Sequence, residues 1–393
     1  MDRISALPDE VLHIILGLVG DELAVTRTAA LSRRWRHVWV HAKSLTIDAA
    51  APGRFVDWVL ARRADQDMGS LQIRISPRGR ARTSPEPANG WLRYAARRVV
   101  GPFALRFRDS SAPLAVELPA AGLARATSIE MDLSNGTLRL PPPVSAAAAA
   151  YESLTALLLF SVHFAVKEDP AGALGHLVSS CCPRLRTLRV VGAGGLPCLA
   201  LRAEALEELE VSFVWCLRTL DVTAPNLRLL KVKRCATDAV RIVAPRLEEM
   251  FISIYRRCPG LPALDVPQPQ DGCLASVRRL NGISVDMHGK YYRGTYVGLD
   301  LMEKCHGVEH VNVMLRHGDE DNYCHGDGDE LLDLTSEAAA PILNVTSMVV
   351  RPIEVPDRYL VASVSALIMR LPCLRSLTVK IYGTKRVSKV YFP

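Results

Sequence analysis

The sequence lacks the features that mark secreted and membrane-spanning proteins. Its first ten residues are acidic and contain Pro8 where the apolar run of a secretory signal would have to begin. Its longest apolar stretch, Leu154–Val166, is broken by His163 and is far shorter than the roughly 20 apolar residues of a spanning helix. We therefore expect no secretory signal and no membrane contact, and a location inside the cell, in the cytoplasm, the nucleus or both.

Metal-binding and disulfide patterns are missing as well. The ten cysteines include no C-x-x-C pair, and the adjacent Cys181 and Cys182 are poorly placed to hold one metal ion together. The acidic stretch 317–330 does not fit a calcium loop, and Cys305-His306 and Cys324-His325 lack the spacing of a metal site. We expect reduced, mostly buried thiols and neither a metal nor a cofactor.

Catalytic motifs are also absent. We find no G-x-S-x-G nucleophile elbow, no G-x-x-x-x-G-K-[ST] phosphate loop and no H-E-x-x-H zinc helix. Gly289 and Gly294 have the outer spacing of a dinucleotide signature, but Tyr291 stands at the central glycine position and would block a pyrophosphate. We expect no enzyme. The alternative is a hydrolase or transferase in the irregular region 255–340, which would show a pocket with convergent polar groups there; we expect no such pocket.

What the sequence does contain is enough apolar material for a large folded body. Hydrophobic residues make up 49% of the chain and charged residues only 23%, and the length exceeds that of one ordinary domain. The net charge of +7 comes mainly from residues 1–110, partly from Arg74, Arg78, Arg80 and Arg82. Pro, Gly and Ser between these arginines predict a loop. No aromatic residue interleaves them, so we expect no nucleic-acid partner.

The N-terminal segment has the pattern of three short helices. Pro8 suits a first helical position, Gly20 would end that helix, and Asp21 and Ser32 are placed to cap the next two. A unit of about 40 residues with so much apolar surface can barely fold alone and invites a packing partner, either another protein or its own body. Its apolar residues recur at helical spacing: Val11, Ile14, Ile15, Leu18 and Val19 in the first helix, and Trp35, Val38 and Trp39 in the third.

Further along, a short apolar pattern repeats. L-x-x-L-x-V or a close variant begins at positions 185, 206, 227 and 247, a spacing of 20 or 21 residues that is the register of leucine-rich repeats. Leu201, Val222 and Ile242 form a second line of the same repeat, each five residues before the next copy. Each unit offers a short strand that cannot bury its apolar face until its neighbours stack on it. Weaker copies start at 129, 154, 308, 345 and 374.

Two stretches carry a resemblance to a known family. Residues 2–12, DRISALPDEVL, followed by LSRRWRHVW at 31–39, closely resemble the F-box of plant F-box proteins. This resemblance implies a three-helix module that binds the Skp-family adaptor of an SCF ubiquitin ligase and, through it, cullin. The run Gly17–Gly20 departs from the family pattern. Carried over by position, the contact residues are Leu7, Pro8, Val11, Ile14, Leu31, Trp35 and Trp39.

The body resembles the degenerate repeat region of plant F-box/leucine-rich-repeat proteins, with a loosely FBD-like C-terminal part at Val345–Val379. We predict an α/β fold: a small N-terminal three-helix F-box-like module at 1–45, linking helices at Phe55–Leu60 and Trp91–Val99 with the Arg-rich loop within 46–110, and an irregular leucine-rich-repeat solenoid at 111–393. The expected function is a substrate-recognition adaptor that holds a protein substrate, whose identity the sequence does not reveal. The alternative is a repeat scaffold whose N-terminal helices only cap the solenoid.

Overall fold

The fold is described from a computed structural model. It describes residues 7–8, 11–12, 41, 43–49, 54–63, 67–76, 85–108, 114–119, 123, 125–141, 151–165, 170–237, 239–255, 276–286, 305–316, 342–353, 357–380 and 387–391. Contacts within the chain divide it into two units. Unit 1 comprises Met1–Leu206 and Val214–Cys216, and unit 2 comprises Glu207–Phe213 and Leu217–Pro393.

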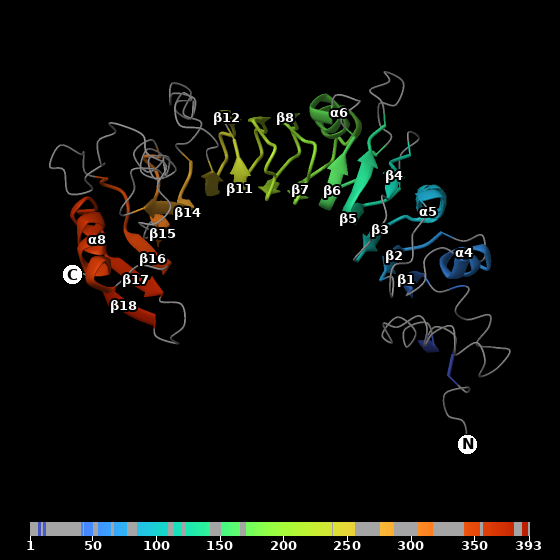
Figure 1. Ribbon diagram of the computed structural model, residues 1–393, viewed down its shortest axis with the longest axis horizontal. Coiled ribbons are helices and arrows are strands. Elements are labelled where there is room, and N and C mark those ends of the chain that lie inside the picture. Colours follow the sequence, from blue (N-terminus) through green and yellow to red (C-terminus); the bar gives the residue numbers. More distant parts are fainter. Residues whose placement is uncertain are drawn as a thin grey trace, which may run out of the picture. The chain divides into compact units, whose positions relative to one another are not determined.

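Unit 1 is built on a parallel sheet whose strands pair in the order β1-β2-β3-β5-β6-β7, with the short β4 beside β5. Its elements, labelled in Figure 1, are β1 (Ser44–Ala49), α4 (Arg54–Ala61), β2 (Ser70–Ile75), α5 (Pro85–Arg98), β3 (Pro102–Phe107), β4 (Ala115–Glu117), β5 (Ser128–Arg139), β6 (Ala156–Phe164), α6 (Pro170–His176), a π-helical turn (Leu177–Cys181), β7 (Thr187–Val191) and β8 (Cys198–Arg202).

The two predicted helices of unit 1 are confirmed as α4 and α5. On α5 the buried residues Ala88, Trp91, Leu92 and Ala95 follow the i, i+3, i+4, i+7 spacing of one helix face. The Trp91 indole donates a hydrogen bond of 2.7 Å to Asp57 on α4, so the buried ring keeps a partner for its N–H. The hydrogen bond from Trp91 to Asp57 therefore links α5 to α4.

Unit 2 continues the repeat pattern in a second parallel set, in the order β9-β11-β13-β14-β15-β16-β17, and β18 pairs antiparallel with β17. Its elements are β9 (Glu208–Ser212), β10 (Thr219–Thr223), β11 (Leu229–Ala236), β12 (Ala239–Val243), β13 (Glu249–Tyr255), β14 (Arg279–Asp286), β15 (His310–Arg316), β16 (Ser347–Ile353), α8 (Asp357–Met369), β17 (Ser376–Lys380) and β18 (Val387–Tyr391). Strands β10 and β12 pair with each other outside this set.

The repeat residues predicted from the sequence form the core of both units. In the copies that begin at 185, 206, 227 and 247 the first apolar residue precedes a strand and the next two are buried on that strand, as Leu230 and Val232 are after Leu227. A turn precedes two of these copies, because the amides of Leu227 and Leu247 donate hydrogen bonds to the carbonyls of Ala224 and Ala244. The second line is confirmed too: Leu201, Val222 and Ile242 are buried on β8, β10 and β12.

The predicted fold class is wrong in its N-terminal part. Among the described residues there are four α-helices, α4, α5, α6 and α8, beside long parallel strand sets, and no three-helix module precedes them. The described chain is therefore mostly a strand-built solenoid of leucine-rich repeats. The region 46–110 holds β1, β2 and β3 of the unit 1 sheet as well as its helices, and Arg74 lies on β2 rather than in a loop. No helix in the described ranges is long and apolar enough to cross a membrane.

Candidate functional site

The first candidate surface is the N-terminal segment, of which the structure describes Leu7, Pro8, Val11 and Leu12. The carbonyl of Pro8 accepts hydrogen bonds of 3.1 Å from the amides of both Val11 and Leu12, which is the opening turn of a helix. Val11 is 36% exposed, whereas Leu12 has no exposed surface. Pro8 and Val11 thus lie on one turn with an apolar side chain left partly open; that they contact a partner stays a prediction.

Four of the predicted contact residues, Ile14, Leu31, Trp35 and Trp39, lie outside the described residues. That they share a face with Leu7, Pro8 and Val11 stays a prediction. The Arg-rich stretch 78–82 and the acidic stretch 317–330 also fall outside the described ranges.

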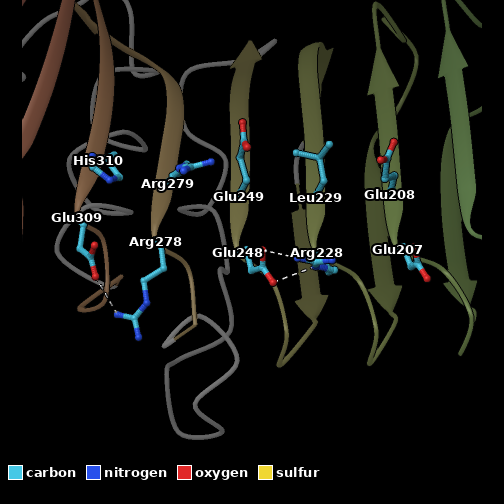
Figure 2. Close-up of a pocket in the computed structure, with 10 residues that line it drawn as sticks. All are labelled: Glu207, Glu208, Arg228, Leu229, Glu248, Glu249, Arg278, Arg279, Glu309 and His310. Carbon is cyan, nitrogen blue, oxygen red and sulfur yellow. Dashed lines mark hydrogen bonds and ion pairs between the residues drawn. The ribbon is translucent and has the colours of Figure 1, made fainter.

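The second candidate surface is a groove in unit 2 of about 510 Å³, which runs across the beginnings of strands β9, β11, β13, β14 and β15. It is formed by the two residues between the apolar positions of L-x-x-L, or of its close variants, in five successive copies. Each repeat thus contributes one adjacent pair (Figure 2). Its lining residues are Glu207, Glu208, Arg228, Leu229, Glu248, Glu249, Arg278, Arg279, Glu309 and His310.

The first residue of each pair alternates in charge from repeat to repeat. Glu207 is followed by Arg228, Glu248, Arg278 and Glu309 along the lower row of Figure 2. Arg228 donates hydrogen bonds of 2.9 and 3.0 Å to both carboxylate oxygens of Glu248, and Arg278 lies 3.8 Å from Glu309. The hydrogen bonds from Arg228 hold the pKa of Glu248 below its usual value. Much of the charge in this row is therefore neutralised within the protein.

The backbone holds this row in register. In the repeats of unit 2 the carbonyl of the first pair residue accepts two amide hydrogen bonds from the next repeat; for example, Arg278 O accepts the amides of Glu309 and His310 at 3.0 and 3.1 Å. The carbonyls of Glu207, Arg228, Glu248 and Glu309 are used in the same way. The groove floor is thus rigid backbone, which presents the side chains at fixed intervals.

The second residue of each pair starts a strand on its outer face. We define the outer face of unit 2 as the positions of β9, β11, β13, β14, β15 and β16 that alternate with the buried core residues. Near β9 this face is acidic and internally bonded: Lys233 lies 3.4 Å from Glu210 and 4.9 Å from the centre of the Phe251 ring. The side-chain amide of Asn281 on β14 donates a hydrogen bond of 2.9 Å to the carboxylate of Glu249 on β13. Lys233, Glu210, Glu249 and Asn281 are therefore bonded to one another or to a neighbouring ring on the part of the outer face near β9 to β14.

At β14–β16 the outer face keeps polar groups without partners. The side chains of Arg279 and His310, aligned in register on β14 and β15, are exposed, and the charge of Arg279 helps to lower the pKa of Glu248. Further along the same strands, Asn312 Oδ1 and Arg351 Nε are covered from solvent and have no hydrogen-bond partner. Buried polar atoms are normally bonded, so these two are exceptions that need an explanation.

Sequence reasoning missed this groove. The expectation of no pocket with convergent polar groups in region 255–340 stays a prediction, because six of the ten residues that line the groove precede this region and 256–275, 287–304 and 317–341 lie outside the described residues. The signal was present in the repeats: with the copies aligned, the residue after the first apolar position reads Glu, Arg, Glu, Arg, Glu from 207 to 309. The irregular spacing between copies after position 250 hid that alternation.

The described cysteines show no paired or metal-bound arrangement. Cys181, Cys182, Cys235 and Cys305 are buried free thiols, and no group of three His, Cys, Asp or Glu side chains that would hold a metal occurs among the described residues. Burial raises the pKa of Cys182 to about 12, so this thiol stays neutral at physiological pH. The groove is lined mainly by charged side chains, and these cysteines are part of the core.

Comparison with known proteins shows which family this chain resembles. Residues 88–260 match the family described as FBD-associated F-box protein At5g56370, LRR repeats. Among relatives from Arabidopsis thaliana, F-box/LRR-repeat protein At3g03360 is 24% identical over 79% of this chain and 59% of its own length. F-box/LRR-repeat protein At5g02910 is 26% identical over 65% of this chain and 53% of its own.

FBD-associated F-box protein At5g60610, from the same organism, is 26% identical over 68% of this chain and 64% of its own length. The chain therefore spans between half and two thirds of the length of these curated relatives. The family match covers repeats that lie mostly in the strands described above, from β3 to β13. Together with the repeat strands seen in the structure, these matches show that the chain is similar to plant F-box/leucine-rich-repeat proteins.

Proposed function

We propose that this protein is the substrate-recognition adaptor of an SCF-type ubiquitin ligase. Its N-terminal segment docks on a Skp-family protein and through it on cullin, and the outer face of the repeats binds the protein to be modified. The observation that carries this proposal is the combination of an F-box-like N-terminal run with a repeat body that presents a rigid, charged groove. Such an adaptor needs no catalytic group of its own, because it acts by raising the local concentration of substrate.

The geometry of the N-terminal turn supports a docking role. Val11 keeps a partly open apolar side chain one turn after Pro8, and apolar anchors at such positions dominate the energetics of protein interfaces. The test is co-purification of the full chain with a Skp-family protein and cullin. We expect Leu7→Ala with Pro8→Ala to abolish capture. Leu343→Ala, which removes an exposed apolar side chain of unit 2, is the control and leaves capture unchanged.

A scaffold without ligase function is the second candidate, because Leu12 is fully buried, as a residue of a capping helix would be. Deleting residues 2–40 separates the two. The cut must stop before Lys43, whose carbonyl accepts the amides of Gly69 and Ser70, and before β1. A docking segment can be removed with the repeats still folded and monodisperse. Removal of a cap exposes core and causes aggregation, and that result together with intact Skp binding by the L7A/P8A variant would reject the adaptor role.

A further inference from the structure

We propose that the outer surface of helices α4 and α5 in unit 1 binds an acidic helix of a partner protein. Glutamate or aspartate side chains of that helix pair with four exposed arginines, and one of its apolar side chains contacts Trp58. We call this the α4–α5 surface and define it by Arg54, Trp58, Arg62, Arg93 and Arg97. The inference does not rest on the proposed ligase function, because it adds a binding surface for a further protein.

Helix α4 buries one face and exposes the other. Its buried residues are Val56, Val59 and Leu60. Arg54, Trp58 and Arg62 follow one another at intervals of four residues, so they lie together on the opposite, exposed side. Arg62 comes just after the helix, in a turn that its amide closes by a hydrogen bond of 3.2 Å to the carbonyl of Val59.

Helix α5 exposes its own arginines on the same side of the sheet. Arg93 and Arg97 are exposed and one turn apart, opposite the buried face that contains Trp91. Each helix connects two neighbouring parallel strands, β1 to β2 and β2 to β3, and such crossovers share one hand, so both helices cover one side of the sheet (Figure 1). The hydrogen bond from Trp91 to Asp57 links the two helices, and their exposed faces therefore form one surface.

The α4–α5 surface carries an excess of positive charge. Helices α4 and α5, with the two residues that follow α4, contain six arginines against two acidic residues. The four arginines of the surface make no hydrogen bond or ion pair with the described residues. Asp57 is the one carboxylate among the described side chains of these helices, and the nearby Asp67 is already bonded to Arg125 at 2.6 and 2.8 Å. The surface therefore complements a negatively charged partner.

Trp58 lies between the two arginines of α4 and is held in place by its neighbours. It is 39% exposed. The Phe55 ring, one turn earlier, stacks on it with ring centres 6.3 Å apart and planes 12° apart. The guanidinium of Arg62, one turn later, lies 4.1 Å from the centre of the Trp58 ring. A tryptophan that is already held loses little conformational freedom on binding, and Trp and Arg are the residues most enriched in interface hot spots.

The spacing of these side chains matches a helix as the partner. Arg93 and Arg97 are about 6 Å apart along α5, and Arg54 and Arg62 are about 12 Å apart along α4. Acidic residues at i and i+4, or at i and i+8, have the same intervals on a second helix that lies alongside. An apolar residue midway between two acidic ones then meets Trp58. Each guanidinium can bind a carboxylate through two parallel hydrogen bonds.

The surroundings of Trp58 favour a protein over a nucleic acid. Exposed aromatic residues bind single-stranded nucleic acid by stacking on its bases. Phe55 and Arg62 contact the indole from opposite ends of the helix, so a nucleobase has no open ring face on which to stack. The exposed part of the indole is its edge, which an aliphatic side chain can cover.

The test measures binding of labelled peptides to the full chain by fluorescence anisotropy at low salt. The probe is a helical Ala/Gln peptide of about 18 residues with four Glu, two of which flank a Leu at four residues on either side. Matched peptides replace all four Glu by Gln, all four by Lys, or the Leu by Ala. We expect the probe to bind, the Gln and Lys peptides to bind about tenfold more weakly, and the Ala peptide about fivefold more weakly.

A single-stranded oligonucleotide with the same net charge as the probe is the competing ligand. We expect it to bind more weakly than the probe, because it gains attraction to the arginines but no contact with Trp58. Equal or tighter binding of the oligonucleotide, or equal binding of the Glu and Lys peptides, overturns the proposal.

Variants locate the site. Arg93→Glu with Arg97→Glu is expected to weaken binding of the probe about tenfold. Arg184→Glu with Arg218→Glu makes the same change in net charge at exposed positions before β7 and β10, and should change the affinity less than about twofold. Trp58→Ala should weaken binding of the Leu peptide but not of the Ala peptide, a difference that loss of folding would not produce. Equal losses in the two double variants overturn the assignment.

Discussion

The guanidinium of Arg228 donates two hydrogen bonds to the carboxylate of Glu248 in the next repeat, at 2.9 and 3.0 Å. The pair is one step of an alternating row that continues with Arg278 and Glu309. Both side chains of the pair are largely exposed, so solvent and salt weaken their attraction. The row therefore determines the charge pattern of the groove more than it stabilises the fold.

Glu248→Gln is expected to lower the melting temperature slightly at neutral pH and low salt. The pKa of Glu248 is depressed in the folded protein by Arg228, so its contribution is present above the unfolded value of about 4.5 and is lost as the pH falls through the folded pKa. The difference between variant and parent should vanish at acidic pH and in 1 M salt, as followed by calorimetry. A difference that persists in both conditions would contradict this account.

Leu230→Ala and Leu229→Ala test the strand register of β11. Leu230 has no exposed surface and Leu229 lies partly exposed on the outer face. We expect Leu230→Ala to cost about 2 to 5 kcal/mol in unfolding free energy and Leu229→Ala to cost under about 1 kcal/mol. Urea unfolding measures both. Because a slip of one residue exchanges the two faces of a strand, a reversed order of these effects would disprove the register.

Gly282→Ala is expected to destabilise unit 2 through the backbone and the ring above it. Gly282 has a φ of +75°, and an added Cβ would come within 2.3 Å of the Phe251 ring. The left-handed conformation alone costs a non-glycine residue about 1 to 3 kcal/mol. Phe251→Ala should relieve the clash but not the backbone strain. The double variant should then be less destabilised than the sum of the single changes, which a double-mutant cycle of unfolding free energies measures.

Cysteine reactivity should follow burial. Cys182 is buried with its pKa raised to about 12, and Cys235 has no exposed surface, whereas Cys373 is exposed. At pH 8 the native protein should be alkylated at Cys373 long before Cys182 or Cys235, as read by peptide mass spectrometry. Denaturant should remove the difference. Early labelling of Cys182 in the native state would mean that its part of unit 1 opens.

Much of the repeat body was predictable from the sequence. Each L-x-x-L-x-V copy indicates where a strand begins and which of its residues point into the core. The strands from β5 to β7, β9, β11, β13 and β15 to β17 lie where the copies predict them. Strands β1, β2 and β3 were missed. Their apolar residues alternate, as in Leu71-Ile73-Ile75 on β2, but they lack the L-x-x-L turn, and intervening helices break the 21-residue spacing.

By itself, the sequence determined which side chains enter the core, since burial of Leu and Val at every second position is a local property of a strand. It also carried the resemblance to plant F-box/leucine-rich-repeat proteins, through the N-terminal run and the repeat pattern. Only the tertiary structure decided which polar residues meet. Glu248 and Arg228 are 20 residues apart in the chain, and the partnerless Asn312 and Arg351 are farther apart still. Their adjacency exists because parallel strands stack in register, a relationship that no single repeat encodes.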